Sequence, residues 1–275
     1  MSALPHTEPA WTDRRIERPG TAPLTLRLYG LGRCTPGTPL VLHFHAGAFT
    51  GGTLAEGATV AQALAAAGSV VASLDYPVAP ARPFPQALEA GHAALQWLHA
   101  QRKGLAGLRA PLYVAGEEAG GNLAAALAMV ARDRGGPELA GAILLSPMLD
   151  MCVATASQRD AHNGPVGCRW ADGWRAYLSR ADDAVHPYAV PARALRLAGL
   201  PRTLLISAAD DPLRDETLAF AQRLRGAGIA AEAQLLPGPT GWPGSYRDAS
   251  PAWAAALHAP LHSFLHSESS RGSTA

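Results

Sequence analysis

The sequence has few cysteines and almost no net charge. The three cysteines, at positions 34, 152 and 168, are too far apart for a zinc spacing and form no even disulfide set, which predicts a reducing, cytoplasmic compartment. With 23 basic and 22 acidic residues, the formal net charge is +1, so there is no electrostatic case for nucleic acid or an anionic membrane. No apolar run reaches membrane-spanning length, and residues 1–15 lack an apolar signal segment.

The sequence contains apolar runs of strand length that alternate with helical patterns, which predicts a doubly wound, mostly parallel α/β sheet with helices on both faces. We expect strands at 15–18, 24–29, 40–45, 69–75, 111–115, 141–145, 203–208 and 231–236. We expect helices at 55–67, 86–101, 119–132, 170–178, 215–225 and 251–265. The domain prediction is a flexible arm at 1–14, one domain at 15–266 with a variable, cap-like region at 146–200, and a disordered tail at 267–275.

Residues 116–122, Gly-Glu-Glu-Ala-Gly-Gly-Asn, lie between a predicted strand and a predicted helix. A strand, a sharp turn flanked by glycines and a helix are the parts of a nucleophile elbow, whose pattern is Gly-x-Ser-x-Gly. Gly116 and Gly120 provide room for the close backbone approach, and the central residue carries backbone strain. Here that central residue is Glu118, with Glu117 before it.

Four stretches resemble the hormone-sensitive-lipase group of α/β-hydrolases, the bacterial esterases and acetyl hydrolases. Residues 45–48, His-Ala-Gly-Ala, match the family's His-Gly-Gly-Gly oxyanion loop with two glycines changed to alanine. Residues 76–85 match its Tyr-Arg-Leu-Ala-Pro-Glu-x-Pro-Phe-Pro stretch, 116–122 its Gly-Asp-Ser-Ala-Gly-Gly-Asn elbow, and 211–216 its acid motif. The resemblance covers residues 15–265 and implies an α/β-hydrolase fold.

The departures from the family pattern lie at the catalytic positions. Glu118 stands where the nucleophilic Ser belongs, and residues 239–243, where the catalytic His is expected, contain no His. Asp211 matches the triad acid and is retained. The segment before the first strand is short, which implies a reduced cap and a more open pocket.

The resemblance implies an oxyanion hole made by the backbone N–H groups of the loop His45, Ala46, Gly47 and Ala48 together with that of Ala119. We expect the Glu118 carboxylate to fold into this hole, because the loop donors and the helix N-terminus both favour an ionised carboxylate. The alternative is a Glu118 side chain that points to solvent in an open pocket. The spacing of the acidic and histidine residues matches no metal-ligand motif, so we predict no metal and no cofactor.

Three functions are compatible with this pattern. The favoured one is a catalytically silent pseudoenzyme that binds a small apolar or ester-like molecule or acts through a partner; the plant gibberellin receptors resemble the same fold without the catalytic His. The second is an active hydrolase or lyase that uses Glu118 as a carboxylate nucleophile or base. The third is an esterase in which other residues serve, with His162 or His186 as base and Ser245 or Ser250 as nucleophile. As in many relatives, a homodimer through a sheet edge or the last helix is left open.

Overall fold

The computed structural model describes residues 11–18, 20–32, 34–160, 164–240, 246, 247 and 251–267, without the side chains of 164–168 and 251–254. Residues 12–14, which we expected to lie in a flexible arm, instead begin the first strand, because Asp13 pairs with Arg27 of the neighbouring strand at 2.9 Å. Residues 1–10 of the predicted arm and residues 268–275 of the predicted tail lie outside the described residues.

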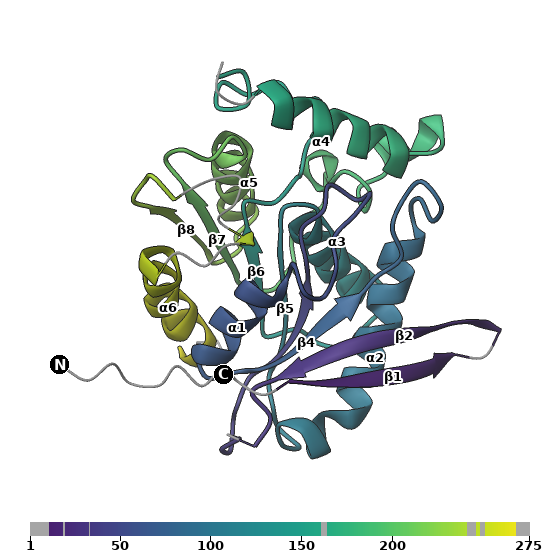
Figure 1. Ribbon diagram of the computed structural model, residues 1–275, viewed down its shortest axis with the longest axis vertical. Helices are drawn as coiled ribbons and strands as arrows, with labels where there is room; N and C mark the ends of the chain where they lie inside the picture. Colours follow the sequence, from purple (N-terminus) through teal and green to yellow (C-terminus); the bar gives the residue numbers. More distant parts are fainter. Residues whose placement is uncertain are drawn as a thin grey trace.

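The described residues form one eight-stranded sheet with helices between the strands (Figure 1). The strands are β1 (Thr12–Arg18), β2 (Thr21–Tyr29), β3 (Leu40–Phe44), β4 (Val70–Asp75), β5 (Leu112–Glu117), β6 (Gly141–Leu145), β7 (Thr203–Ala208) and β8 (Ala231–Leu236). The helices are α1 (Ala58–Ala66), α2 (Gln86–Leu105), α3 (Ala119–Asp133), α4 (Gly164–Tyr177), α5 (Arg214–Gly226) and α6 (Pro251–His266). Short 3-10 turns occupy Ala181–Val185 and Pro191–Arg193.

The strand order is β1-β2-β4-β3-β5-β6-β7-β8, which confirms the predicted doubly wound sheet. Strands β3 to β8 run parallel, whereas β1 and β2 form an antiparallel hairpin that joins β4 at one edge. The central strands β3, β5, β6 and β7 are buried along their whole length, as expected for parallel strands covered on both faces.

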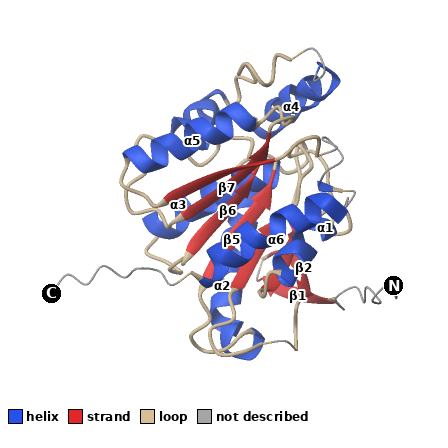
Figure 2. Ribbon diagram, turned by 90° about the vertical axis from the view of Figure 1, so that its left-hand side faces the viewer, coloured by secondary structure: helices blue, strands red, loops and turns tan. Residues whose placement is uncertain are grey.

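Helices cover both faces of the sheet, as Figure 2 shows from the side. One apolar core lies under α2, α3 and α5 and includes Phe44, Leu127 and Phe220. The second core lies under α1 and α6 and includes Leu64 and Leu261. This arrangement leaves the carboxyl ends of the parallel strands as the edge where loops from many strands meet, which is where open α/β sheets place their sites.

Helix α4 lies over this edge of the sheet (Figure 1). It is longer than the predicted helix at 170–178, because it begins at residue 164. It packs closely on the loop after β3: a Cβ on Gly173 would lie 2.2 Å from the carbonyl oxygen of Ala48. The ring of Tyr177 also stacks on Phe49 with 4.1 Å between centroids. The cap is therefore held directly against the loop that we predicted to form the oxyanion hole.

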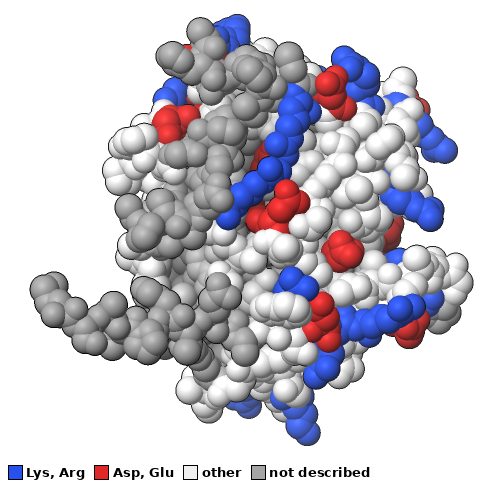
Figure 3. All heavy atoms as spheres, in the orientation of Figure 1, with Lys and Arg blue, Asp and Glu red and all other residues white. Residues whose placement is uncertain are grey.

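Charged side chains of both signs are interspersed over the face drawn in Figure 3. Among the residues that the structure describes, no helix is long and apolar enough to cross a membrane.

Candidate functional site

Glu118 occupies a strained turn between β5 and α3. Its backbone has φ 54° and ψ −116°, a region that costs a non-glycine residue about 1–3 kcal/mol. The turn is forced by close backbone approach on both sides: a Cβ on Gly116 would lie 2.3 Å from the carbonyl oxygen of Gly120, and one on Gly120 would lie 2.1 Å from that of Phe44. The sequence prediction of a nucleophile elbow at these glycines is therefore confirmed in its geometry.

The Glu118 carboxylate turns inward and is only 8% exposed. Its Oε2 accepts hydrogen bonds from the backbone N–H of Gly47 at 2.8 Å and of Ala48 at 3.3 Å. Its Oε1 accepts one from the indole N–H of Trp170 on α4 at 2.6 Å. The carboxylate thus occupies the backbone donors of the loop after β3, as we expected from the sequence.

Trp170 also corrects one expectation. The short segment before β1 predicted an open pocket above position 118, but the Trp170 side chain is 1% exposed and covers the Glu118 carboxylate. The physical reason is the close contact of α4 with the loop at Ala48, which brings the indole within hydrogen-bonding distance.

Ala46 and Glu117 form a second contact beneath the loop. The N–H of Ala46, which we expected to donate into the oxyanion hole, instead donates to Oε1 of Glu117 at 3.1 Å. The other oxygen of Glu117 contacts Nε2 of His43 at 2.7 Å, and Nδ1 of His43 contacts the hydroxyl of Ser73 at 2.9 Å. The side chains of Glu117, His43 and Ser73 are all buried. Glu117 therefore positions the loop rather than facing a ligand.

His45 supports the same loop from its other side. Its ring stacks on Tyr76 with 4.3 Å between centroids, and the Tyr76 hydroxyl donates to the His45 carbonyl oxygen at 2.7 Å. Nδ1 of His45 contacts the carbonyl oxygen of Ala46 at 2.8 Å, and burial lowers the pKa of the imidazole. Ala119, the first residue of α3, is buried behind Glu118. Within the described residues, the donors to the carboxylate are Gly47, Ala48 and Trp170.

Asp211, at the position of the triad acid, is 2% exposed and lies after β7. It accepts hydrogen bonds from the hydroxyl of Ser146, from that of Ser207 at 3.1 Å and from the N–H of Leu213 at 2.8 Å. Burial raises the pKa of Asp211 to about 6, although these three hydrogen bonds lower it. The carboxylate of the triad acid is therefore present, but it accepts hydrogen bonds from two serine hydroxyl groups.

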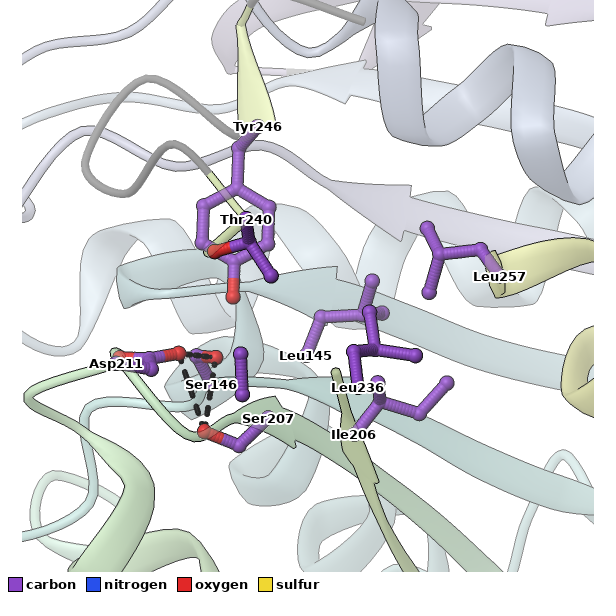
Figure 4. A pocket seen from close by; sticks show the side chains of 10 residues that line it. Leu145, Ser146, Ile206, Ser207, Asp211, Leu236, Thr240, Tyr246 and Leu257 are labelled. Carbon is purple, nitrogen blue, oxygen red and sulfur yellow. Dashed lines mark hydrogen bonds between the residues drawn. The ribbon is translucent and has the colours of Figure 1, made fainter. Parts of the chain in front are cut away.

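Tyr246 lies three residues beyond the stretch 239–243, in which we expected the catalytic histidine and which contains none. The phenol and Asp211 line the same cavity of about 10 Å³, which has room for about one water molecule. Figure 4 shows the Tyr246 hydroxyl pointing toward Ser146 and Asp211. Burial raises the pKa of the phenol well above its usual range, and the Asp211 carboxylate acts in the same direction. Of the segment 239–243 where the histidine was expected, residues 241–243 lie outside the described residues.

A family model described as alpha/beta hydrolase fold matches residues 41–240, which include the elbow, the loop after β3 and Asp211. The chain belongs to the α/β-hydrolase fold family. Its fold is that of the carboxylesterase and lipase type.

Named relatives of this α/β-hydrolase include esterases and a receptor. The carboxylesterase NlhH of Mycobacterium tuberculosis is 31% identical over 231 residues, 82% of this chain and 72% of that protein. The gibberellin receptor GID1A of Arabidopsis thaliana is 31% identical over 201 residues, 69% of this chain and 58% of the receptor. The solved structure of a hyperthermophilic esterase from the archaeon Pyrobaculum calidifontis superimposes with a TM-score of 0.79 at 31% identity, covering 93% of this chain and 85% of the esterase.

The other histidines that we considered in this α/β-hydrolase form no hydrogen bond with Glu118 or Asp211 in the described part of the chain. His186 packs on Phe84 and Tyr188, and its Nδ1 accepts a hydrogen bond from the Tyr188 N–H at 3.1 Å. His258 and His262 lie on α6. The substitute residues at 162, 245 and 250 lie outside the described residues. In the described part of the chain, no histidine forms a hydrogen bond with Glu118 or Asp211, and no group of three or more His, Cys, Asp or Glu side chains is placed to hold a metal ion.

Proposed function

We propose that this α/β-hydrolase is a catalytically silent member of its family, and that it binds a small apolar or ester-like molecule without hydrolysing it. The observation that carries the proposal is the Glu118 carboxylate, which accepts hydrogen bonds from Gly47 and Ala48. In an acyl-transfer site, such backbone donors stabilise the oxygen of the reacting carbonyl group. Here the chain's own side chain occupies them.

The same contacts argue against Glu118 as a nucleophile. A carboxylate that attacks an ester needs a free oxygen, and the tetrahedral intermediate needs donors for its new oxyanion. Both oxygens of Glu118 accept short hydrogen bonds, and two of the donors are the loop N–H groups that would be needed for the oxyanion. Hydrolysis of a glutamyl ester would also need a base near the attacking water.

Binding without catalysis is supported by one named relative, a gibberellin receptor. The proposed ligand is apolar or ester-like because the fold is of the carboxylesterase type. Its entry to Glu118 would require Trp170 of α4 to move, since that side chain covers the carboxylate. The balance of 23 basic and 22 acidic residues disfavours nucleic acid as a partner. Homodimerisation stays a prediction to be tested by the molar mass of the protein in solution.

The first test is hydrolysis of 4-nitrophenyl acetate and butyrate by the wild type and by Glu118→Ala. We expect both proteins to hydrolyse the esters no faster than buffer without protein. Turnover by the wild type that disappears in Glu118→Ala would establish a carboxylate mechanism and refute the proposal.

Reconstruction of the two altered positions provides the matched comparison. We expect Glu118→Ser and Tyr246→His each to remain inactive, because each lacks either the base or the nucleophile. The double variant Glu118→Ser/Tyr246→His has both, with residue 246 at the cavity that Asp211 also lines, and it is expected to exceed either single variant in ester hydrolysis. An equal rate in a folded double variant and in both single variants would show that Tyr246 does not stand in the position of the base.

Ligand binding has a separate readout. Short-chain esters and apolar carboxylic acids are screened by their effect on the thermal unfolding midpoint, which rises when a ligand binds only the folded state. A true ligand of this site is expected to stabilise the wild type and to lose that effect in Trp170→Phe. Stabilisation that is unchanged in Trp170→Phe would place the ligand elsewhere.

A further inference from the structure

Helix α6 bears three histidines at a spacing of four residues, His258, His262 and His266, which we call the histidine ladder. All three side chains are exposed, whereas Leu257 and Leu261 of the same helix are buried in the core. Residues four apart lie above one another on a helix, so the three imidazoles form one row on the solvent side. The ladder is separate from the closed site at Glu118.

The rings of the histidine ladder are neighbours in the structure. The centroids of His258 and His262 are 5.9 Å apart with ring planes 19° apart, and those of His262 and His266 are 4.6 Å apart. Nε2 of His266 contacts the carbonyl oxygen of Ala67 at 2.9 Å, at the end of α1. His266 is thereby held in position, whereas the ring contacts of His258 and His262 among the described residues are with the other rings of the ladder.

Two imidazoles four residues apart on one helix face can ligate the same cation, as in zinc sites built on a helix. Imidazole nitrogen suits Zn²⁺, Ni²⁺ and Cu²⁺ rather than Mg²⁺ or Ca²⁺, which prefer oxygen. Because no group of three such ligands is preassembled in the described part of the chain, the protein supplies two ligands and water the rest. Side-chain rotation alone brings the two exposed rings together, and no backbone change is needed.

We propose that His258 and His262 bind one divalent transition-metal ion of the Zn²⁺, Ni²⁺ and Cu²⁺ class on the exposed face of α6. The ring of His266 lies against that of His262, tilted by 40°, and limits its rotamers, so His266 positions a ligand rather than ligating. The affinity is expected to be lower than that of a structural zinc site, because such sites use four protein ligands.

The test is calorimetric titration of NiCl₂ and ZnCl₂ into the untagged, full-length protein. We expect one ion per chain in the wild type, and at least a tenfold weaker affinity in His258→Ala and in His262→Ala. A matched control is His99→Ala, which removes an exposed histidine from α2 that has no histidine four residues away, and it is expected to bind like the wild type. Equal affinity in the wild type, His258→Ala and His262→Ala would overturn the proposal.

A second variant tests the spacing while keeping the number of histidines. His262→Ala/Ser263→His/His266→Ala, compared with His266→Ala, moves the second imidazole to the fifth position after His258, which turns it away from the first on the helix surface, and the absence of His266 prevents a new pair with residue 263. Residue 263 is exposed, so this variant is expected to fold like the wild type and to lose metal binding. Retained binding would show that any pair of surface histidines suffices, and the specific site would be refuted. Binding lost equally in His266→Ala and His262→Ala would make His266 a ligand and overturn the assignment of the pair.

Discussion

Replacement of Glu118 tests whether its carboxylate holds the cap onto the core. Glu118→Ala removes the acceptor for three donors, the N–H groups of Gly47 and Ala48 and the indole N–H of Trp170. A buried donor left without a partner costs about 1–3 kcal/mol, so three would together cost about 3–9 kcal/mol in a dry site. Removal of a desolvated charge returns several kcal/mol of this. We therefore expect Glu118→Ala to lower the free energy of unfolding by about 2–4 kcal/mol.

The backbone at position 118 predicts an unusual order among the variants. Glu118→Gly removes the same carboxylate, but glycine adopts a positive φ without strain, whereas alanine retains a cost of about 1–3 kcal/mol. Glycine also loses more conformational entropy on folding than alanine, which offsets part of this gain. Glu118→Gly is therefore expected to be about 1 kcal/mol more stable than Glu118→Ala. Glu118→Gln keeps one acceptor oxygen but presents an amide donor to the loop or to the indole, so it too is expected to be destabilised.

The assay is urea unfolding followed by circular dichroism and by tryptophan fluorescence, with the m-value checked for each variant. The cycle of Glu118→Ala, Trp170→Phe and the double variant isolates the contact between carboxylate and indole, and we expect a coupling of about 1–2 kcal/mol. If Glu118→Ala is as stable as the wild type and the coupling is zero, the carboxylate does not hold α4 in place, and the reasoning fails.

Two further predictions concern buried groups. Burial raises the pKa of Asp211 to about 6 from an ordinary value near 3.8, so its ionisation in the folded protein removes up to about 3 kcal/mol of stability as the pH rises from about 4 to about 6. We therefore compare the free energy of unfolding of the wild type with that of Asp211→Asn. The difference, wild type minus variant, should fall between about pH 4 and pH 6, and a flat or rising difference would contradict the raised pKa of Asp211. Gly120→Ala places a Cβ 2.1 Å from the carbonyl oxygen of Phe44 and is expected to prevent stable folding, whereas Gly104→Ala on α2 meets no atom within 4 Å and is expected to be tolerated; this is measured by soluble yield and unfolding midpoint.

The strands, the elbow and the acid were predictable because their signals are local. The apolar run at 40–45 and the glycines at 116 and 120 specify a strand and a close turn from the properties of a few neighbouring residues. The inward turn of Glu118 was also predictable, because backbone donors and a helix N-terminus attract a carboxylate whatever the rest of the chain does.

Three features of the site depend on contacts between segments that are distant in the sequence. Local sequence patterns could not predict them. Trp170 reaches Glu118 only because α4 packs on the loop at Ala48. The N–H of Ala46 meets Glu117 rather than Glu118 because the loop turns between residues 46 and 47, where φ of Gly47 is 150°. Tyr246 carries no motif that distinguishes it from other tyrosines, so the contact with the Asp211 cavity becomes visible only in the fold.

The glycines of the elbow fix the shape of the turn independently of which side chain stands at position 118. The bend at position 118 is imposed by the carbonyl oxygens of Gly120 and Phe44, which would lie 2.3 Å from a Cβ on Gly116 and 2.1 Å from a Cβ on Gly120. No single substitution can relax such a bend, because a larger residue at either glycine collides before the turn can open. The side chain at position 118 can therefore be exchanged while the strained turn that presents it stays the same.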